Sequence, residues 1–243
     1  MKLTKLALIG AVTLSTVSVG TSAFAEEKAN INMNSKTDVT FIEDKSTTDP
    51  NNPENPNEKV TPENPGEHEK GTAGPLSINY VSNLHFGENV ISGNDQTYFA
   101  KLDTVKKGND KVAVPNFVSV TDKRGTNVGW KLKVKQDGQF KSGTNELTNA
   151  ALTLSNPVVN SVTDQAYAPK TFNKSVTLNP GGAAVEITTA EKGKGMGDWT
   201  TAFGKGSDQG KESVSLFVPG TTAKVKDAKY TATLTWTLED TPN

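Results

Sequence analysis

Hydrophobic and polar residues alternate along most of the chain after residue 74, most clearly in 127–135 (NVGWKLKVK) and 229–240 (KYTATLTWTLED). Successive side chains of a β-strand point to opposite faces, so this period of two is typical of half-buried strands. Gly, Asn, Asp and Pro separate the segments, and only residues 145–154 could form a short helical turn. The pattern predicts an all-β fold, an antiparallel β-sandwich. The predicted strands are residues 76–82, 96–102, 116–122, 127–135, 150–155, 175–179, 183–188, 213–219 and 229–240.

Two of these strands contain the same Trp-x-Leu triplet, with Trp130 and Leu132 in the first and Trp236 and Leu238 in the second. In each strand the Trp and the Leu share a face because they are two residues apart. A half-buried strand needs such a pair of large apolar groups, so we predict that all four residues belong to the core. Exposed Trp rings also stack on sugars, and direct contact of these residues with a ligand is the alternative.

The third tryptophan lies in a glycine-rich stretch, residues 190–212 (AEKGKGMGDWTTAFGKGSDQGKE). Glycines allow a close backbone approach or a mobile loop, and we predict a loop that Trp199 and Phe203 pin to the sandwich. Alternatively, these two residues form a small exposed aromatic platform. Of the three tryptophans, Trp199 is then the best candidate for direct ligand contact. The G-K-G-K-G run lacks the spacing and the strand–turn–helix context of a nucleotide-binding loop.

The N-terminus has the features of a secretory signal peptide. Basic residues precede the apolar run 6–20, and Ala23-Phe24-Ala25 fits the small-x-small cleavage rule. We therefore predict a signal peptide over residues 1–25, cleaved between Ala25 and Glu26. The apolar run is shorter than the roughly 20 residues of a membrane span, and no later segment is apolar enough to span a bilayer.

The mature chain divides into three parts by composition. In residues 26–46, Val39 and Phe41 share one face, which predicts one or two short strands that pair with the main domain. Residues 47–74 are rich in Pro, Asn and Glu and have too few apolar groups to offset the entropy of ordering, which predicts a solvated linker or loop. Residues 75–243 are expected to form the main β domain with one well-buried core.

The composition restricts the function classes. The chain has no cysteine, two histidines, 26 basic and 27 acidic residues, and a net charge of −1. Disulfides and thiolate metal sites are excluded, and charge provides no reason to bind nucleic acid or an anionic membrane. Histidines, carboxylates and serines follow no motif for a zinc site, glycoside hydrolysis or a serine nucleophile. We therefore expect no enzymatic activity, no cofactor and no metal site.

Several segments together carry a resemblance to a known family: 74–87 (GPLSINYVSNLHFG), 129–134 (GWKLKV), 195–204 (GMGDWTTAFG), 214–220 (VSLFVPG) and 230–242 (YTATLTWTLEDTP). With these segments the chain resembles the WxL-domain cell-surface proteins of low-GC Gram-positive bacteria, in particular the small WxL proteins. The resemblance covers essentially the whole mature chain. It implies non-covalent attachment to peptidoglycan, a membrane-anchored partner with a WxL-interacting region, and association with other WxL proteins.

The expected protein is secreted and remains at the cell wall or cell surface. The sequence ends at Asn243 without a sortase signal or a hydrophobic tail, so we expect it to stay on the cell by binding. The leading hypothesis is peptidoglycan binding, with the WxL-interacting surface protein as a partner. The alternatives are an adhesin that binds a host extracellular-matrix protein and an enzyme that acts on wall glycan.

Overall fold

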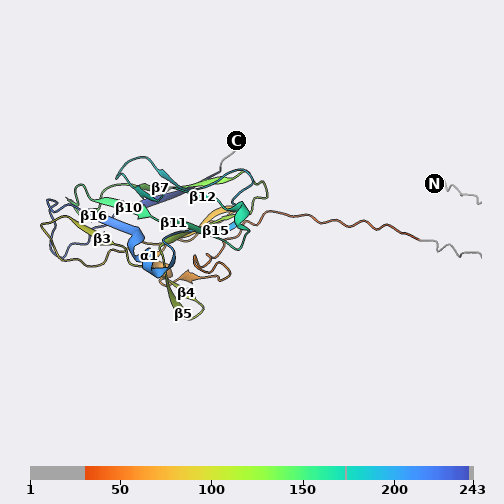
Figure 1. Cartoon of the computed structure of the whole chain (residues 1–243), viewed down its shortest axis with the longest axis horizontal. Coiled ribbons are helices and arrows are strands. Elements are labelled where there is room, and N and C mark those ends of the chain that lie inside the picture. Colours follow the sequence, from red (N-terminus) through yellow and green to blue (C-terminus); the bar gives the residue numbers. More distant parts are fainter. Residues whose placement is uncertain (1–30, 173, 241–243) are drawn as a thin grey trace, which may run out of the picture. The chain divides into compact units, whose positions relative to one another are not determined.

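The computed structural model describes residues 31–172 and 174–240 (Figure 1). Contacts between residues divide the chain into two units, Met1–Thr40 and Phe41–Asn243. The strands and helices of the described residues all lie in the second unit. Among the described residues, no helix is long and apolar enough to cross a membrane.

The segment before residue 47 differs from its prediction. Residues 31–46 form no strand, and the side chains of Val39, Phe41 and Ile42 are 74%, 90% and 90% exposed. The predicted N-terminal strand is therefore wrong for residues 31–46. The segment has no partner strand for its backbone groups, and an isolated extended segment is not stable as a strand in water. The predicted signal peptide and its cleavage site between Ala25 and Glu26 lie outside the described residues.

The strands of the described residues form antiparallel sheets, and each larger sheet is named here by one of its inner strands. The β7 sheet has the order β12 (Lys170–Thr171), β14 (Val185–Ala190), β7 (Trp130–Gln136), β17 (Leu234–Asp240). The β6 sheet has the order β11 (Pro157–Asn160), β15 (Gly197–Phe203), β6 (Phe117–Asp122), β2 (Leu76–Val81). The β10 sheet has the order β13 (Ser175–Thr177), β10 (Ala151–Ser155), β16 (Val214–Val218), β3 (Gln96–Phe99).

Smaller elements complete the domain. The β4 sheet has the order β1 (Thr61–Pro62), β4 (Asp103–Lys107), β5 (Asp110–Val114), and β8 (Lys141–Ser142) pairs with β9 (Asn145–Glu146). The described residues include one α-helix, α1 (Gly206–Ser213), and two 3-10 turns, η1 (Pro65–Glu67) and η2 (Gln165–Tyr167). The predicted all-β class with antiparallel sheets is confirmed. The strands are divided among these sheets, whereas the sequence predicted the two sheets of a sandwich.

The core consists of three clusters that join neighbouring sheets. One cluster joins the inner faces of the β7 and β6 sheets through Trp130, Leu132, Val120 and Trp199. A second cluster joins the β7 sheet to the β10 sheet and includes Phe203 of the β6 sheet, and a third joins the β6 sheet to the β4 sheet. The β7 sheet thus covers parts of two other sheets with one face. Alternation along a strand predicts which face is apolar but not which sheet covers it, and this explains why the sandwich prediction is incomplete.

The Pro-rich segment is packed against the domain over residues 50–62. Val60 is 1% exposed and joins the cluster between the β6 and β4 sheets, and β1 pairs with β4. Lys59 Nζ lies 3.0 Å from Asp198 Oδ2 on β15. The predicted solvated loop over residues 47–74 is therefore wrong for this part. One well-placed apolar side chain and strand pairing stabilise a segment whose average composition predicts disorder.

Candidate functional site

The two Trp-x-Leu triplets, which are far apart in the sequence, lie on adjacent strands. β7 and β17 pair antiparallel with Leu132 directly opposite Leu238, and Trp236 opposite Val134. Because the strands run in opposite directions, the two tryptophans lie on opposite sides of the leucine pair. Trp130, Leu132, Trp236 and Leu238 all pack into the core clusters, so their predicted inward orientation is confirmed.

The two triplets differ in how deeply they are buried. Trp130 and Leu132 are both 0% exposed, whereas Trp236 and Leu238 are half-buried. The cause is strand position: β7 has neighbours on both sides, and β17 is the edge strand of its sheet. An edge strand leaves one flank of its side chains without covering neighbours. The same triplet therefore provides a fully buried pair on β7 and a partly accessible pair on β17.

The glycine-rich stretch forms the pocket that holds Trp130. The indole Nε1 of Trp130 donates a hydrogen bond of 2.9 Å to the backbone carbonyl of Gly195. Gly195 has a φ of +75°, and a Cβ at this position would lie 2.6 Å from Trp130 Nε1 and 2.4 Å from Ala190 Cβ. Only glycine fits here, because of both the left-handed backbone and the close approach of the ring. At least this glycine of the stretch serves tryptophan packing.

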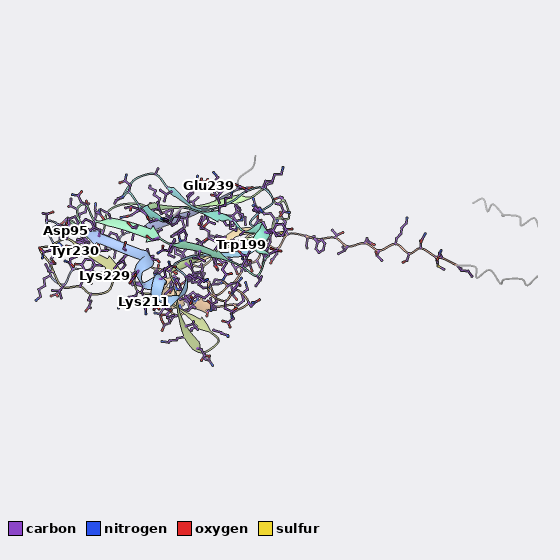
Figure 2. All side chains as sticks on the ribbon, viewed as in Figure 1. Asp95, Trp199, Lys211, Lys229, Tyr230 and Glu239 are labelled. Carbon is purple, nitrogen blue, oxygen red and sulfur yellow. The ribbon has the colours of Figure 1, made fainter. Side chains whose placement is uncertain are left out.

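Trp199 belongs to a buried strand and not to a loop. It lies in β15, is 1% exposed, and its Nε1 donates a 2.9 Å hydrogen bond to the carbonyl of Met196. Figure 2 shows Trp199 among the strands of the domain. β15 is flanked by β11 and β6, so both of its edges are paired. The predicted loop is wrong for this residue, and the many neighbouring glycines concealed the strand.

The contact alternative is therefore excluded for part of the predicted site. Phe203 is 1% exposed, so neither it nor Trp199 forms an exposed aromatic platform. Trp130 and Leu132 also have no accessible surface with which to contact a ligand. Of the six predicted binding residues, only Trp236 and Leu238 retain accessible surface. A direct role of these two in binding stays a prediction.

Trp236 differs from the other tryptophans in its polar contacts. Its ring centroid lies 6.5 Å from that of Phe203, and it packs against two of the core clusters. Trp130 and Trp199 both donate their indole N–H to a backbone carbonyl. Within the described part of the chain, the structure records no such hydrogen bond for Trp236. A half-buried indole of this kind can still donate to water or to a ligand.

The single arginine of the chain fastens the end of β17, a role that the sequence analysis missed. Arg124 Nε lies 2.9 Å from Asp122 Oδ1, and Nη2 lies 2.8 Å both from Asp122 Oδ2 and from the carbonyl of Gly129. Its Nη1 also pairs with Asp240 at the end of β17. The hydrogen bonds to Asp122 raise the pKa of Arg124, and the bond to Asp240 acts in the same direction. The only feature of the sequence that could have indicated this role was a single arginine next to a glycine in a turn.

The outer face of the β7 sheet is hydrophilic and balanced in charge. Lys131 Nζ lies 3.0 Å from Glu186 Oε2, and Lys133 Nζ lies 2.6 Å from Oε2 of Glu239, which is labelled in Figure 2. A hydrogen bond from Thr189 and the contact with Lys131 hold the pKa of Glu186 below its usual value. Exposed pairs of this kind keep a sheet soluble but add little stability.

Among residues 31–172 and 174–240, no group of three or more His, Cys, Asp or Glu is placed to hold a metal ion.

Comparison with known proteins supplies a family. A family model described as "WxL domain surface cell wall-binding" matches residues 28–242. The match includes both Trp-x-Leu strands, the glycine-rich stretch and the Pro-rich segment, and it confirms the resemblance drawn from the sequence. Searches of curated proteins and of solved structures give no match.

Proposed function

Because the chain belongs to the WxL domain surface cell wall-binding family, we propose that it attaches to the peptidoglycan layer by non-covalent binding. The family match over nearly the whole chain is the observation that carries this proposal. The protein then acts as a binding module and not as an enzyme. A membrane-anchored surface protein with a WxL-interacting region is the proposed partner that would help to retain it at the wall.

The arrangement of the Trp-x-Leu motifs supports a scaffold role for most of the signature. Trp130 and Leu132 are fully buried, so they stabilise the β7 sheet and cannot touch the wall. Binding must then use exposed side chains that this core holds in place. Flat sheet faces supported by a rigid core are suitable for a repeating polymer, because they order binding groups before the ligand arrives.

The test is a sedimentation assay with the mature protein and purified sacculi, with and without the membrane-anchored partner. We expect the protein to sediment with sacculi and to be released by strong denaturant or high salt. Release only after muramidase digestion would indicate a covalent link and would contradict the proposal. Binding to host matrix protein without binding to sacculi would favour the adhesin alternative, and release of muropeptides would favour an enzyme.

A further inference from the structure

The outer face of the β10 sheet carries no charged side chain. Residues that alternate with the buried positions of β13, β10, β16 and β3 form this face, which is hereafter the Ser/Thr/Phe face. Its members are Ser175, Thr177, Ala151, Thr153, Ser155, Ser215, Phe217, Thr97 and Phe99. By contrast, lysines and glutamates in ion pairs fill the outer face of the β7 sheet. The two outer faces are therefore suited to different ligands.

Two phenylalanines form one exposed aromatic patch on the Ser/Thr/Phe face. Phe217 on β16 pairs with Thr97, and Phe99 lies two residues further along β3, opposite Ser215. Such diagonal neighbours lie about 7–8 Å apart, within reach of aromatic rings. Phe99 is 47% exposed and Phe217 is 37% exposed. A single exposed apolar residue needs no explanation, but two adjacent rings on an otherwise hydroxyl-bearing face do.

An open depression of about 640 Å³ adjoins this face. Ala151 and Thr177 belong to both, and Ala151 pairs directly with Phe217. Asn149 and Asn179 also line the depression, and in the described part of the chain the structure records no hydrogen bond from either side-chain amide. Each amide offers two donors and one acceptor. The depression thus places polar groups that can bind a ligand beside the aromatic patch.

The chemistry of these groups favours a sugar chain over a protein. A pyranose ring has an apolar C–H face, which stacks on aromatic rings, and a rim of hydroxyl or acetamido groups, which bond to hydroxyls and amides. Ser and Thr are under-represented among residues that dominate protein interfaces, and Ser is depleted there. The Ser/Thr/Phe face carries no charge, and the one charged residue that lines the depression, Glu146, is paired with Lys141, which matches an uncharged glycan rather than an anionic wall polymer.

We propose that the Ser/Thr/Phe face and the adjoining depression form a binding site for an uncharged chain of N-acetylated hexosamines. The inference rests on the proposed function and specifies its ligand and its site. Phe99 and Phe217 stack on successive sugar rings. Asn179 and Asn149 bond to acetamido or hydroxyl groups of a ring in the depression.

The test compares a Phe99→Ala/Phe217→Ala double variant with a matched Phe41→Ala variant and the wild type. Phe41 is 90% exposed and lies outside the site, so it controls for the loss of an exposed ring. The probes are purified sacculi, by sedimentation, and soluble β-linked oligomers of N-acetylglucosamine, by titration calorimetry. We expect the double variant to keep its melting temperature, because exposed residues contribute little to stability. It should lose about tenfold or more in affinity for both probes, since two stacked rings are removed. Phe41→Ala should bind like the wild type.

A second variant tests the depression. Asn179→Ala should weaken binding of the soluble oligomer by about fivefold, the effect of one hydrogen bond to a neutral group. Wild-type affinity of Asn179→Ala would remove the depression from the proposed site.

The remaining outcomes separate the site from the proposed function. If the wild type and the double variant bind sacculi equally, the inferred site is wrong and the proposed function stands. If the wild type binds the soluble oligomer through the two rings but not sacculi, the proposed function alone is wrong. If neither probe is bound, both are wrong. Loss of binding to a protein partner with unchanged oligomer binding would make the face a protein interface and overturn the inference.

Discussion

Strands β7 and β17 carry the same triplet and pair with each other, yet the structure uses them differently. On β7 the tryptophan is 0% exposed, donates its N–H to Gly195 and fits a pocket that only glycine permits. On β17 the tryptophan is half-buried at the edge of the sheet. The difference shows that a sequence motif specifies the inward face of a strand, whereas the neighbours of that strand decide how much of the motif remains accessible.

The test with the largest expected effect on stability replaces each of these tryptophans with alanine. Trp130→Ala should cost about 3–5 kcal/mol of unfolding free energy, because it leaves a large closed cavity. Trp236→Ala should cost roughly 1–2 kcal/mol, because water can reach part of the vacated space. Denaturant unfolding of both variants measures the difference. Equal losses would show that burial does not distinguish the two strands. A stable Trp236→Ala protein that binds sacculi less well would make Trp236 a contact residue.

The second test concerns the arginine clamp at the ends of the same strands. The side chain of Asp122 is 2% exposed and that of Asp240 on β17 is 56% exposed, although both pair with Arg124. Asp122→Asn should cost about 3 kcal/mol, because it leaves a buried cation without its bidentate partner. Asp240→Asn should cost about 0–1 kcal/mol, as is usual for an exposed ion pair. Thermal melts compare them, and a larger loss for Asp240→Asn would make the end of β17 the more important anchor.

The third test addresses the pocket that β7 has and β17 lacks. Gly195→Ala should destabilise by about 2–3 kcal/mol, because its Cβ would overlap Trp130 and the backbone is left-handed. Gly193→Ala is the matched control, since Gly193 has a φ of +80° but nothing within 4 Å of a Cβ. It should cost only about 1 kcal/mol of backbone strain. Similar losses for both variants would show that conformation alone, and not Trp130, requires the glycine at 195.

The smallest expected effect lies on the outer face of β7. The folded protein holds the pKa of Glu186 below its ordinary value of 4.5, through Thr189 first and then Lys131. This contact therefore stabilises the fold above pH 4.5, and the contribution disappears as the pH falls through the lowered pKa. The group is exposed, so solvent screening limits the effect to a few tenths of a kcal/mol. Melting temperatures at neutral and acidic pH should show a slightly smaller acid loss for Glu186→Gln than for the wild type. An unchanged acid loss would contradict this role.

The candidate site was predictable from the sequence in part. Alternation placed Trp130, Leu132, Trp236 and Leu238 on inward faces, and the structure agrees. Glycine content misplaced Trp199, because the glycines around it indicated a loop, whereas it lies in the buried strand β15 with a paired strand on each side. Alternation along the chain could not indicate the role of Arg124, because one of its partners lies near it in the sequence and another lies more than a hundred positions away.

The sequence by itself determined the all-β class, the inward face of each Trp-x-Leu strand and the family, because these depend on local alternation and on local motifs. Only the tertiary structure decided that the two triplets pair through Leu132 and Leu238, that β17 is an edge, and that residues 50–62 pack on the domain. The physical reason is that strand pairing joins residues distant in the chain. Their partners are selected by the packing of the whole core, which no short window of sequence contains.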